Sequence, residues 1–290
     1  MKPAPFTYHD PTSAAEVAEL LGRLDNSRLL AGGQSLMPLM NFRYVVVDHL
    51  IDLNGVGELA YIRREGPRLA LGAMTRQRDL EFSPEIAAAS PIILEALGQV
   101  GHRQTRNRGT FGGSLCHLDP SAELANIALL HDAELEILSR DGSRRTSMGE
   151  FAKGFMTPDL GEGEFLAGAS FAAWPQGHGW AFEEFSRRRG DFAIVASGVL
   201  LTLDSAGAID RAAIALSGVG PIPVRLAEAE SALKGQTPGH EACRAAAIAA
   251  SRIEAMEDAQ VGAKYRRHLA RILTYRALER AGARARRLSE

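Results

Sequence analysis

The spacing of apolar and polar residues predicts alternating helices and strands in the first part of the chain. Residues 13–16 (SAAE) have the pattern of a capping box, and apolar residues follow at helical spacing from Val17 to Leu24. A short strand at 28–30 runs straight into AGGQS, and the apolar run at 45–53 indicates a buried strand. The other elements expected here are a strand at 68–73, helices opening at 75 and covering 86–100 and 121–132, and a hairpin over 134–148 turned by Asp141-Gly142.

The last part of the chain has a different order, with strands first and helices at the end. Residues 174–179 (WPQGHG) break the pattern in a way typical of a linker. Strands are expected at 180–188, 192–204 and 212–220, and helices at 241–255 and 262–281. We therefore predict an α+β protein with three subdomains, at residues 1–54, 55–176 and 177–290.

Composition and charge narrow the class of protein. The chain has 290 residues, of which 46% are apolar and 23% charged, as is ordinary for a soluble globular protein. Its net charge of −2 gives no reason to expect a nucleic-acid partner. Cys116 and Cys243 are too few for a disulfide framework or an iron–sulfur cluster within the chain. Because we find no signal-peptide core and no apolar run of spanning length, we predict a cytoplasmic protein without a transmembrane segment.

The first segment with candidate chemistry is residues 29–36 (LLAGGQSL), a strand that runs into a Gly-Gly turn and a short helix. Gly32 and Gly33 lack a Cβ atom, so backbone N–H groups here can approach a phosphate closely, and a helix N-terminus adds favourable partial charge. Ser35 is placed to donate its hydroxyl and to cap the helix. An ordinary Gly-Gly turn explains the same pattern, so both interpretations stay open.

The second such segment is residues 106–115 (RNRGTFGGSL), with two carboxylates, Asp119 and Glu123, close behind it. With three glycines, two arginines and the hydroxyls of Thr110 and Ser114, such a loop can wrap a diphosphate with backbone donors, and the carboxylates can bind ribose or ribityl hydroxyls. A long polar connection between two helices is the alternative. Connections of this length without structure of their own are usually functional.

Other motif interpretations fail. The chain has no P-loop, no HExxH and no GxSxG motif, and we predict no catalytic residue in it. Residues 55–60 (GVGELA) look like a dinucleotide fingerprint, but Pro67 ends the segment before a long helix can form. The basic helix at 262–281 has apolar residues at core spacing, so its arginines form a solvated face or contact another subunit. Metal-ligand spacing is absent among the three histidines of the central region, His102, His117 and His131.

Taken together, the two segments resemble the FAD-pyrophosphate loops of the medium, flavin-binding subunits of molybdenum hydroxylases. That family includes carbon monoxide dehydrogenase, quinoline oxidoreductase and nicotine-type dehydrogenases. The similarity rests on AGGQSLMPLMNFR and TRNRGTFGGSLCHLDPSAEL, and extends to FTYHDPTSAAEVAELL, LGAMTRQRDLE, FSRRRGDFAIV and GAKYRRHLARILTYRAL. It implies a vanillyl-alcohol-oxidase-like (PCMH-type) fold, with FAD-binding subdomains at 1–54 and 55–176 and a C-terminal flavoprotein domain at 177–290 that has a small antiparallel sheet and helices.

The resemblance also implies the FAD-binding residues. The diphosphate would be bound by the backbone of Leu29, Leu30, Ala31, Gly32, Gly33, Gln34, Ser35 and Leu36, with the Ser35 hydroxyl. From the opposite side it would be held by Gly109, Thr110, Gly112, Gly113 and Ser114. The remaining matches are Asp119 and Glu123 at flavin or ribose polar groups, His102 and Thr105 at the cofactor, Leu166 near the adenine or flavin, and Phe192 against the isoalloxazine face.

The implied function is electron relay. Family members work with a large subunit that carries the molybdenum cofactor and a small subunit with two [2Fe–2S] clusters, as a dimer of heterotrimers. FAD on this chain would take electrons from the clusters and pass them to an external acceptor. Gln34 replaces the His of carbon monoxide dehydrogenases and, with RNRGTFGGSL, favours an N-heteroaromatic substrate. Phe192 replaces a Tyr of several relatives, and core packing is an alternative role for it. A self-contained FAD-dependent oxidase and a flavin-free assembly module stay open as other functions.

Overall fold

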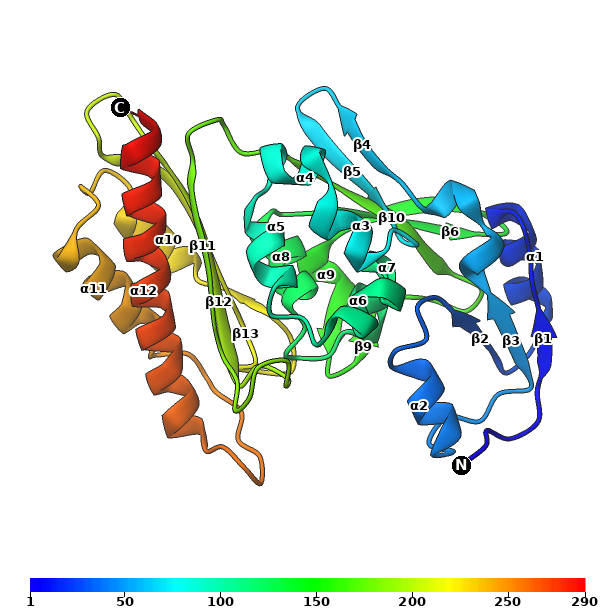
Figure 1. Ribbon diagram of the computed structural model, residues 1–290. Coiled ribbons are helices and arrows are strands. Elements are labelled where there is room, and N and C mark those ends of the chain that lie inside the picture. Colours follow the sequence, from blue (N-terminus) through cyan, green and yellow to red (C-terminus); the bar gives the residue numbers. More distant parts are fainter. Residues whose placement is uncertain (290) are drawn as a thin grey trace.

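Three larger β-sheets follow one another along the chain in the computed structural model, which describes residues 1–289 (Figure 1). The first sheet is parallel, with the order β1-β3-β2, and consists of β1 (Thr7–His9), β2 (Ser27–Leu30) and β3 (His49–Asp52). Parallel neighbours need crossover connections. Helices α1 (Ala14–Arg23) and α2 (Leu36–Asn41) lie in these connections, and the short 3-10 turns η1 (Leu53–Gly55) and η2 (Gly57–Leu59) lead out of the sheet.

In this first region the predicted helix start is confirmed and the predicted third strand is too long. The Ser13 hydroxyl accepts a hydrogen bond from the Glu16 N–H at 3.2 Å and caps α1. The Glu16 carboxylate bonds the amide one residue before Ser13, so the capping box is only half formed. Strand β3 does not begin at the start of the predicted range 45–53, because the Tyr44 N–H bonds the Leu39 carbonyl and turns the chain around the end of α2.

The second sheet is antiparallel and has the order β4-β5-β10-β6-β7. Its strands are β4 (Ile62–Glu65), β5 (Arg68–Gly72), β6 (Glu134–Ser139), β7 (Gly142–Ser147) and β10 (Phe165–Ala172). Short helices lie between these strands in sequence: α3 (Gln77–Phe82), α4 (Pro84–Ala89), α5 (Ile92–Leu97), α6 (Arg103–Arg108), α7 (Phe111–His117), α8 (Glu123–Leu130) and α9 (Met148–Phe151). Strands β8 (Ala152–Gly154) and β9 (Thr157–Pro158) form a separate two-stranded sheet.

Apolar residues on the two faces of this second sheet belong to different cores. Leu69, Leu71 and Leu135 pack with the buried residues of α3, α5, α7 and α8. Phe165 and Ala167 pack on the other side with residues of α1, η1 and η2. Figure 1 shows α3, α5, α7 and α8 on one side of the strands of the second sheet and α1 on the other. The sheet is therefore covered on both faces, and the helical side continues toward the third sheet.

Two predicted features of the second region are wrong in detail. The helix predicted over 86–100 is divided into α4 and α5, because Pro91 disfavours helical backbone at the residue before it. The predicted hairpin forms as β6 and β7, but Ser139 pairs with Gly142, so the two turn residues are Arg140-Asp141. Glycine at 142 adopts a φ of +139°, which accounts for its position at the start of the returning strand.

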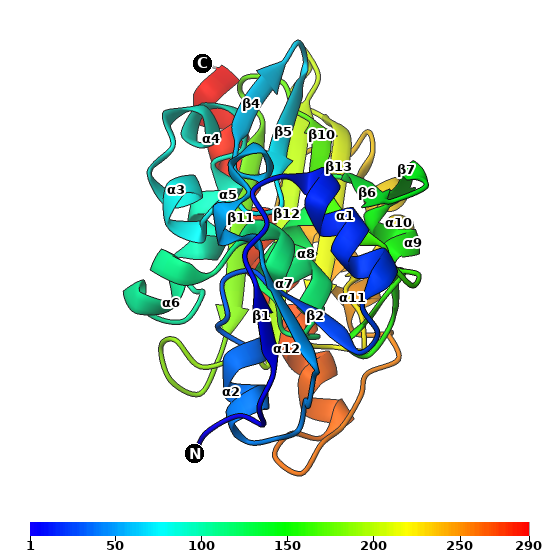
Figure 2. The same cartoon turned by 90° about the vertical axis from the view of Figure 1, so that its right-hand side faces the viewer.

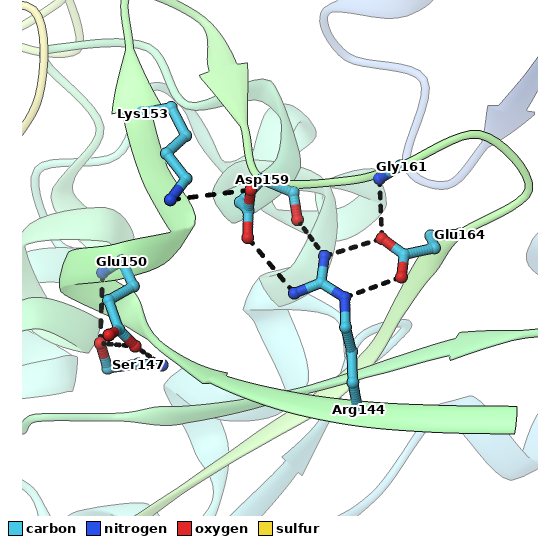
Figure 3. A network of polar contacts seen from close by, with 7 residues as sticks. All are labelled: Arg144, Ser147, Glu150, Lys153, Asp159, Gly161 and Glu164. Atoms are coloured by element: carbon cyan, nitrogen blue, oxygen red, sulfur yellow. Dashed lines mark hydrogen bonds and ion pairs between the residues drawn. The ribbon is translucent and has the colours of Figure 1, made fainter.

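An ion-pair network fastens the segment before β10 to strand β7 (Figure 3). The Arg144 guanidinium lies 2.7 Å from Glu164 and 3.3 Å from Asp159, and Lys153 approaches Asp159 at 3.7 Å. Glu164 also accepts the Gly161 N–H at 2.7 Å, and its hydrogen bond from Arg144 lowers the pKa of its carboxyl. Each charged group has a partner, so we assign this cluster to holding the loop in place rather than to chemistry.

The third sheet is antiparallel, with the order β11-β12-β13-β14. Its strands are β11 (Gly179–Phe185), β12 (Val195–Leu203), β13 (Ile209–Ser217) and β14 (Val224–Arg225). Helices α10 (Ala227–Leu233), α11 (His240–Ala250) and α12 (Ala263–Ser289) cover its outer face (Figures 1 and 2). The inner face, including Phe182, Ala196 and Leu200, joins the core formed by the helices of the second region. The second and third regions therefore share one hydrophobic core across their contact.

Several arginines of α12 bind within the chain, which corrects the expectation of a solvated or intersubunit face. Arg266 is 4% exposed and donates to the carbonyl oxygens of Ile194 (2.7 Å) and Gly218 (2.6 Å). Arg280 pairs with Glu95 at 3.0 Å, joining α12 to the second region. Among the described residues, none of the helices has the length and apolarity that a bilayer crossing needs.

Candidate functional site

The turn between β2 and α2 presents consecutive backbone amides without a partner. Within residues 1–289, the N–H groups of Gly32, Gly33, Gln34 and Ser35 meet no hydrogen-bond acceptor. Gly33 has a φ of +71°, a conformation that favours glycine. Ser35 occupies the N-cap position of α2 but its side chain makes no capping bond, contrary to the predicted cap, so its hydroxyl stays available. Consecutive free N–H groups form a concave site for an anionic oxygen.

The second glycine segment is helical, which corrects its description as a loop with free backbone donors. Its residues belong to α6 and α7, with Gly109 and Thr110 between them. The N–H groups of Gly109, Gly112 and Gly113 already bond Thr105 O (2.7 Å), Ala73 O (2.8 Å) and the Thr110 hydroxyl (3.1 Å). Among the described residues, the Ser114 hydroxyl and the Thr110 N–H have no partner and remain as donors on this side.

The two glycine segments lie directly against each other, although they are far apart in the sequence. A Cβ atom at Gly32 would lie 2.3 Å from the Arg108 carbonyl oxygen and 2.8 Å from the Gly109 Cα. A Cβ atom at Gly113 would lie 3.5 Å from the side chain of Ala31. Only glycine allows the backbones to approach this closely at position 32. The fold therefore brings the two predicted segments into direct contact.

Two residues that the sequence analysis missed tie the segments together. Arg76 donates to the Arg108 carbonyl and to the Asn54 side-chain oxygen, and Asn54 donates to the Ala31 carbonyl at 3.2 Å. This chain of bonds runs from the second segment to the first. Burial lowers the pKa of the Arg76 guanidinium, and the charge of Arg108 adds to that effect. A residue before a helix and a residue in a turn carry no sequence signal for this role.

The acidic residues behind the second segment lie at the contact with the third sheet. One oxygen of Asp119 accepts the Ser121 N–H at 2.8 Å, and the Ser121 hydroxyl donates to the Ala193 carbonyl at 2.7 Å. Glu123 is the first residue of α8. Burial raises the pKa of its carboxyl to about 7, opposed by a bond from its own amide and reinforced by the charge of Asp119. The turn thus brings both carboxyls to the boundary between the two regions.

His102 and the turn before Phe192 meet at the same boundary from different regions. A Cβ atom at Gly190 would lie 2.6 Å from the His102 ring, so the turn before Phe192 rests on that imidazole. Phe192 is 75% exposed, so the alternative of core packing is wrong. An exposed ring at this boundary is free to pack against a ligand. Thr105 lies on α6, and its hydroxyl would be 3.3 Å from a Cβ atom at Gly101.

The predicted leucines are placed differently from the glycines. Leu166 is 3% exposed on β10 and packs in the core of the second region. Leu29 packs in the core that includes α1, while Leu30 and Leu36 pack around the small core under α2. These side chains anchor the segments in the protein, and the backbone between them forms the surface of the site.

Comparisons with known proteins match both parts of the chain. Residues 4–171 match the family described as FAD binding domain in molybdopterin dehydrogenase, and residues 180–281 match the CO dehydrogenase flavoprotein C-terminal domain. The 6-hydroxypseudooxynicotine dehydrogenase complex subunit alpha of Paenarthrobacter nicotinovorans is 37% identical over 292 residues, covering 100% of this chain and 99% of that protein. The carbon monoxide dehydrogenase medium chain of Hydrogenophaga pseudoflava is 37% identical over 286 residues, covering 98% and 99%.

Solved structures give the same result. Carbon monoxide dehydrogenase from Hydrogenophaga pseudoflava matches with a TM-score of 0.94 and 38% identity over 98% of this chain and 99% of that one. Quinoline 2-oxidoreductase from Pseudomonas putida 86 matches with a TM-score of 0.94 and 34% identity over 98% and 99%. The fold and the paired glycine segments thus define an FAD-binding flavoprotein of the oxidoreductases. The chain belongs to the family of FAD-binding medium subunits of molybdenum-containing hydroxylases.

Proposed function

We propose that this chain is the electron-relay subunit of a molybdenum hydroxylase and holds FAD between its two glycine segments. The observation that carries the proposal is the row of four amides at residues 32–35 that have no partner among the described residues, in contact with the segment that contains Gly109. A diphosphate supplies the anionic oxygens that such amides bind. FAD provides the two-electron redox chemistry, and the chain's own residues bind it, orient it and set its electrostatic surroundings.

The residues have separate roles in this proposal. The amides from Gly32 to Ser35 and the hydroxyls of Ser35 and Ser114 bind the diphosphate. Gly109, Gly112 and Gly113 contribute by letting the cofactor come close to the backbone, since their own amides are already bonded within the protein. The other proposed contacts are Asp119 and Glu123 with ribityl or flavin polar groups, His102 and Phe192 with the isoalloxazine, and Thr105 and Leu166 with neighbouring parts of the cofactor.

We place the substrate chemistry on partner subunits. The large partner would carry the molybdenum cofactor and the small partner two [2Fe–2S] clusters, in a dimer of heterotrimers. Relatives that match over nearly their whole length are named as a medium chain and as a subunit of a complex. These names support the role of a subunit rather than that of a self-contained oxidase or an assembly module. Relatives are also named for caffeine, nicotine and quinoline, and this together with Gln34 supports an N-heteroaromatic substrate.

Three finer statements belong to the same proposal. We assign the fold to the vanillyl-alcohol-oxidase-like (PCMH-type) class. We place the subdomain boundaries at 1–54, 55–176 and 177–290, which is supported by one larger sheet lying within each range. We also propose a cytoplasmic location for the complex, which rests on the sequence pattern alone.

The experiment that tests this function is purification from the native host, followed by absorption spectroscopy and mass identification of co-eluting chains. We expect flavin bands, iron–sulfur absorption and two partner chains in one complex. A flavin spectrum on a solitary chain with oxidase activity would contradict the subunit role. Absence of flavin from the intact complex would contradict the assignment of both glycine segments.

A further inference from the structure

One carboxyl oxygen of Glu184 is buried without a hydrogen-bond partner. Among the described residues, its Oε2 atom has neither a donor nor an acceptor within reach. An ionised carboxylate in that condition costs several kcal/mol, so such groups are rare unless they are neutral or serve a ligand. Glu184 takes no part in the contacts described above.

The direction of the Glu184 side chain follows from the alternation along strand β11. Its neighbour Glu183 points to the outer face, where it pairs with Arg280 of α12. Residues two apart lie on the same face of a strand. Glu184 therefore shares the inner face with Trp180 and Phe182, which belong to or pack against the core of the second region. Its side chain faces the FAD-binding part of the molecule.

Glu123 reaches the same place from helix α8. One turn further along this helix, Asn126 donates to the Ala215 carbonyl at 3.1 Å, and its Oδ1 lies 2.8 Å from where a Cβ atom would stand at Gly198. Gly198 pairs with Phe182 in the sheet, and two residues back Ala196 pairs with Glu184. One helical turn is about 5.4 Å and two strand residues about 6.6 Å. Stepping one turn back from Asn126 along α8, and two residues back from Gly198 along β12, thus brings Glu123 opposite Glu184.

The charges around this pair are negative or already neutralised. Within residues 1–289, no cation is among the charges that shift the pKa of Glu123 or of Glu184. On the α8 side, the charge of Asp119 also acts on Glu123 and raises its pKa. On strand β12 the partner of Glu184 is the uncharged Ala196. The groups on the elements packed against β11 are bound to one another, namely Glu183 and Glu95 with Arg280, and Glu95 with Arg284.

Two partly buried carboxyls that face each other without a cation do not both ionise readily. Burial raises the pKa of Glu184 to about 8, and the charge of Glu123 adds to the effect. Burial likewise raises the pKa of Glu123 to about 7. The geometry and the charges agree that the pair carries at most one negative charge near neutral pH.

We propose that Glu123 and Glu184 form a proton-holding pair whose ionisation controls FAD affinity, with Glu184 acting as a positioning residue through Glu123. The inference rests on the proposed function, in which Glu123 contacts the cofactor. FAD brings a negatively charged diphosphate into the site. Full ionisation of the pair at alkaline pH places two charges beside the cofactor and weakens its binding.

The test is the FAD dissociation constant of the reversibly deflavinated complex, measured by fluorescence titration at pH 6.5 and at pH 9. We expect wild-type affinity to fall roughly tenfold across this range, the equivalent of one pKa unit of interaction. In Glu184→Gln the change should be clearly smaller than in the wild type, since only Glu123 can then ionise and the second negative charge does not develop. Glu183→Gln is the matched control, because the neighbouring carboxyl faces α12, and it should retain the wild-type pH dependence.

A second measurement guards against a variant that does not fold. Difference infrared spectroscopy of the wild-type complex at pH 6.5 and pH 9 should show a protonated carboxyl band that disappears at the higher pH, and Glu123→Gln should alter the same band. An unchanged pH dependence in Glu184→Gln, or no protonated carboxyl in the wild type, would overturn the inference. If FAD binds at neither pH, the proposed function itself fails. If FAD binds equally well at both, only the proton-holding pair fails.

Discussion

Replacing Gly32 with alanine tests whether the two glycine segments hold one cofactor between them. The new Cβ atom would lie 2.3 Å from the Arg108 carbonyl oxygen and 2.8 Å from the Gly109 Cα. Both are backbone atoms, so no side-chain rotation relieves the contact, and Arg76 holds that carbonyl in place. The segments must therefore separate by about 1 Å to restore ordinary contact, and such overpacking costs about 1–3 kcal/mol of folding free energy.

The effect on FAD should exceed the effect on folding. A shift of about 1 Å takes a donor at 2.9 Å from a phosphate oxygen outside hydrogen-bonding range. Hydrogen bonds to charged groups contribute about 1.5–3 kcal/mol each. Loss of two of them weakens binding by about 3 kcal/mol or more, which is at least about a hundredfold in the dissociation constant. We expect Gly32→Ala to purify with little flavin while keeping its secondary structure.

The assay is the ratio of flavin absorbance to protein after gel filtration, with circular dichroism and urea unfolding on the same samples. Gly57→Ala is the control, since its Cβ atom would meet nothing within 4 Å and its φ is not positive. That variant should keep full flavin occupancy and change stability by less than about 0.5 kcal/mol. If folded Gly32→Ala retains FAD with wild-type affinity, the segments do not grip the cofactor jointly and the reasoning is refuted.

Two further predictions concern stability. Arg266→Met removes the donor to the carbonyls of Ile194 and Gly218. It should lower the free energy of unfolding, measured by urea titration, by about 2–4 kcal/mol. A loss below about 0.5 kcal/mol would show that water replaces the guanidinium. Burial lowers the pKa of His131 to about 3, so the unfolded chain binds the extra proton between about pH 6.5 and 3, and stability falls as pH decreases through that window. His131→Asn should remove about 2 kcal/mol of the stability difference between pH 7.5 and pH 5, and an unchanged difference would contradict this assignment.

The local pattern of apolar and polar residues was sufficient to predict the elements that are buried on one face or on both. The apolar run in 192–204 predicts β12, which the structure confirms as a strand buried between α12 and the helices of the second region. The helical spacing in 262–281 predicts α12. The first glycine segment could also be predicted from the sequence, because two successive glycines between a strand and a helix limit the possible backbone conformations.

Local pattern failed where long-range contacts decide the backbone. The run RNRGTFGGSL contains poor helix formers. Helix α7 forms nevertheless, because the Thr110 hydroxyl accepts the Gly113 N–H and caps it, and the Gly112 N–H bonds the carbonyl of Ala73, the residue after strand β5. Tertiary hydrogen bonds override low propensity here. The same bonds occupy the amides that were predicted to bind the diphosphate. Because the segment was predicted to be a loop and not a helix, its backbone N–H groups were wrongly expected to be free donors.

The adjacent residues Glu183 and Glu184 show why part of the site lies beyond sequence reasoning. They are chemically identical, and no local pattern separates them. The register of β11 turns one toward Arg280 on α12 and the other toward Glu123 at the start of α8. A shift of one residue in that register would exchange the two side chains between the faces of the sheet. The charge state at the proposed cofactor site is therefore a property of sheet pairing, and only the folded structure assigns it to a particular residue.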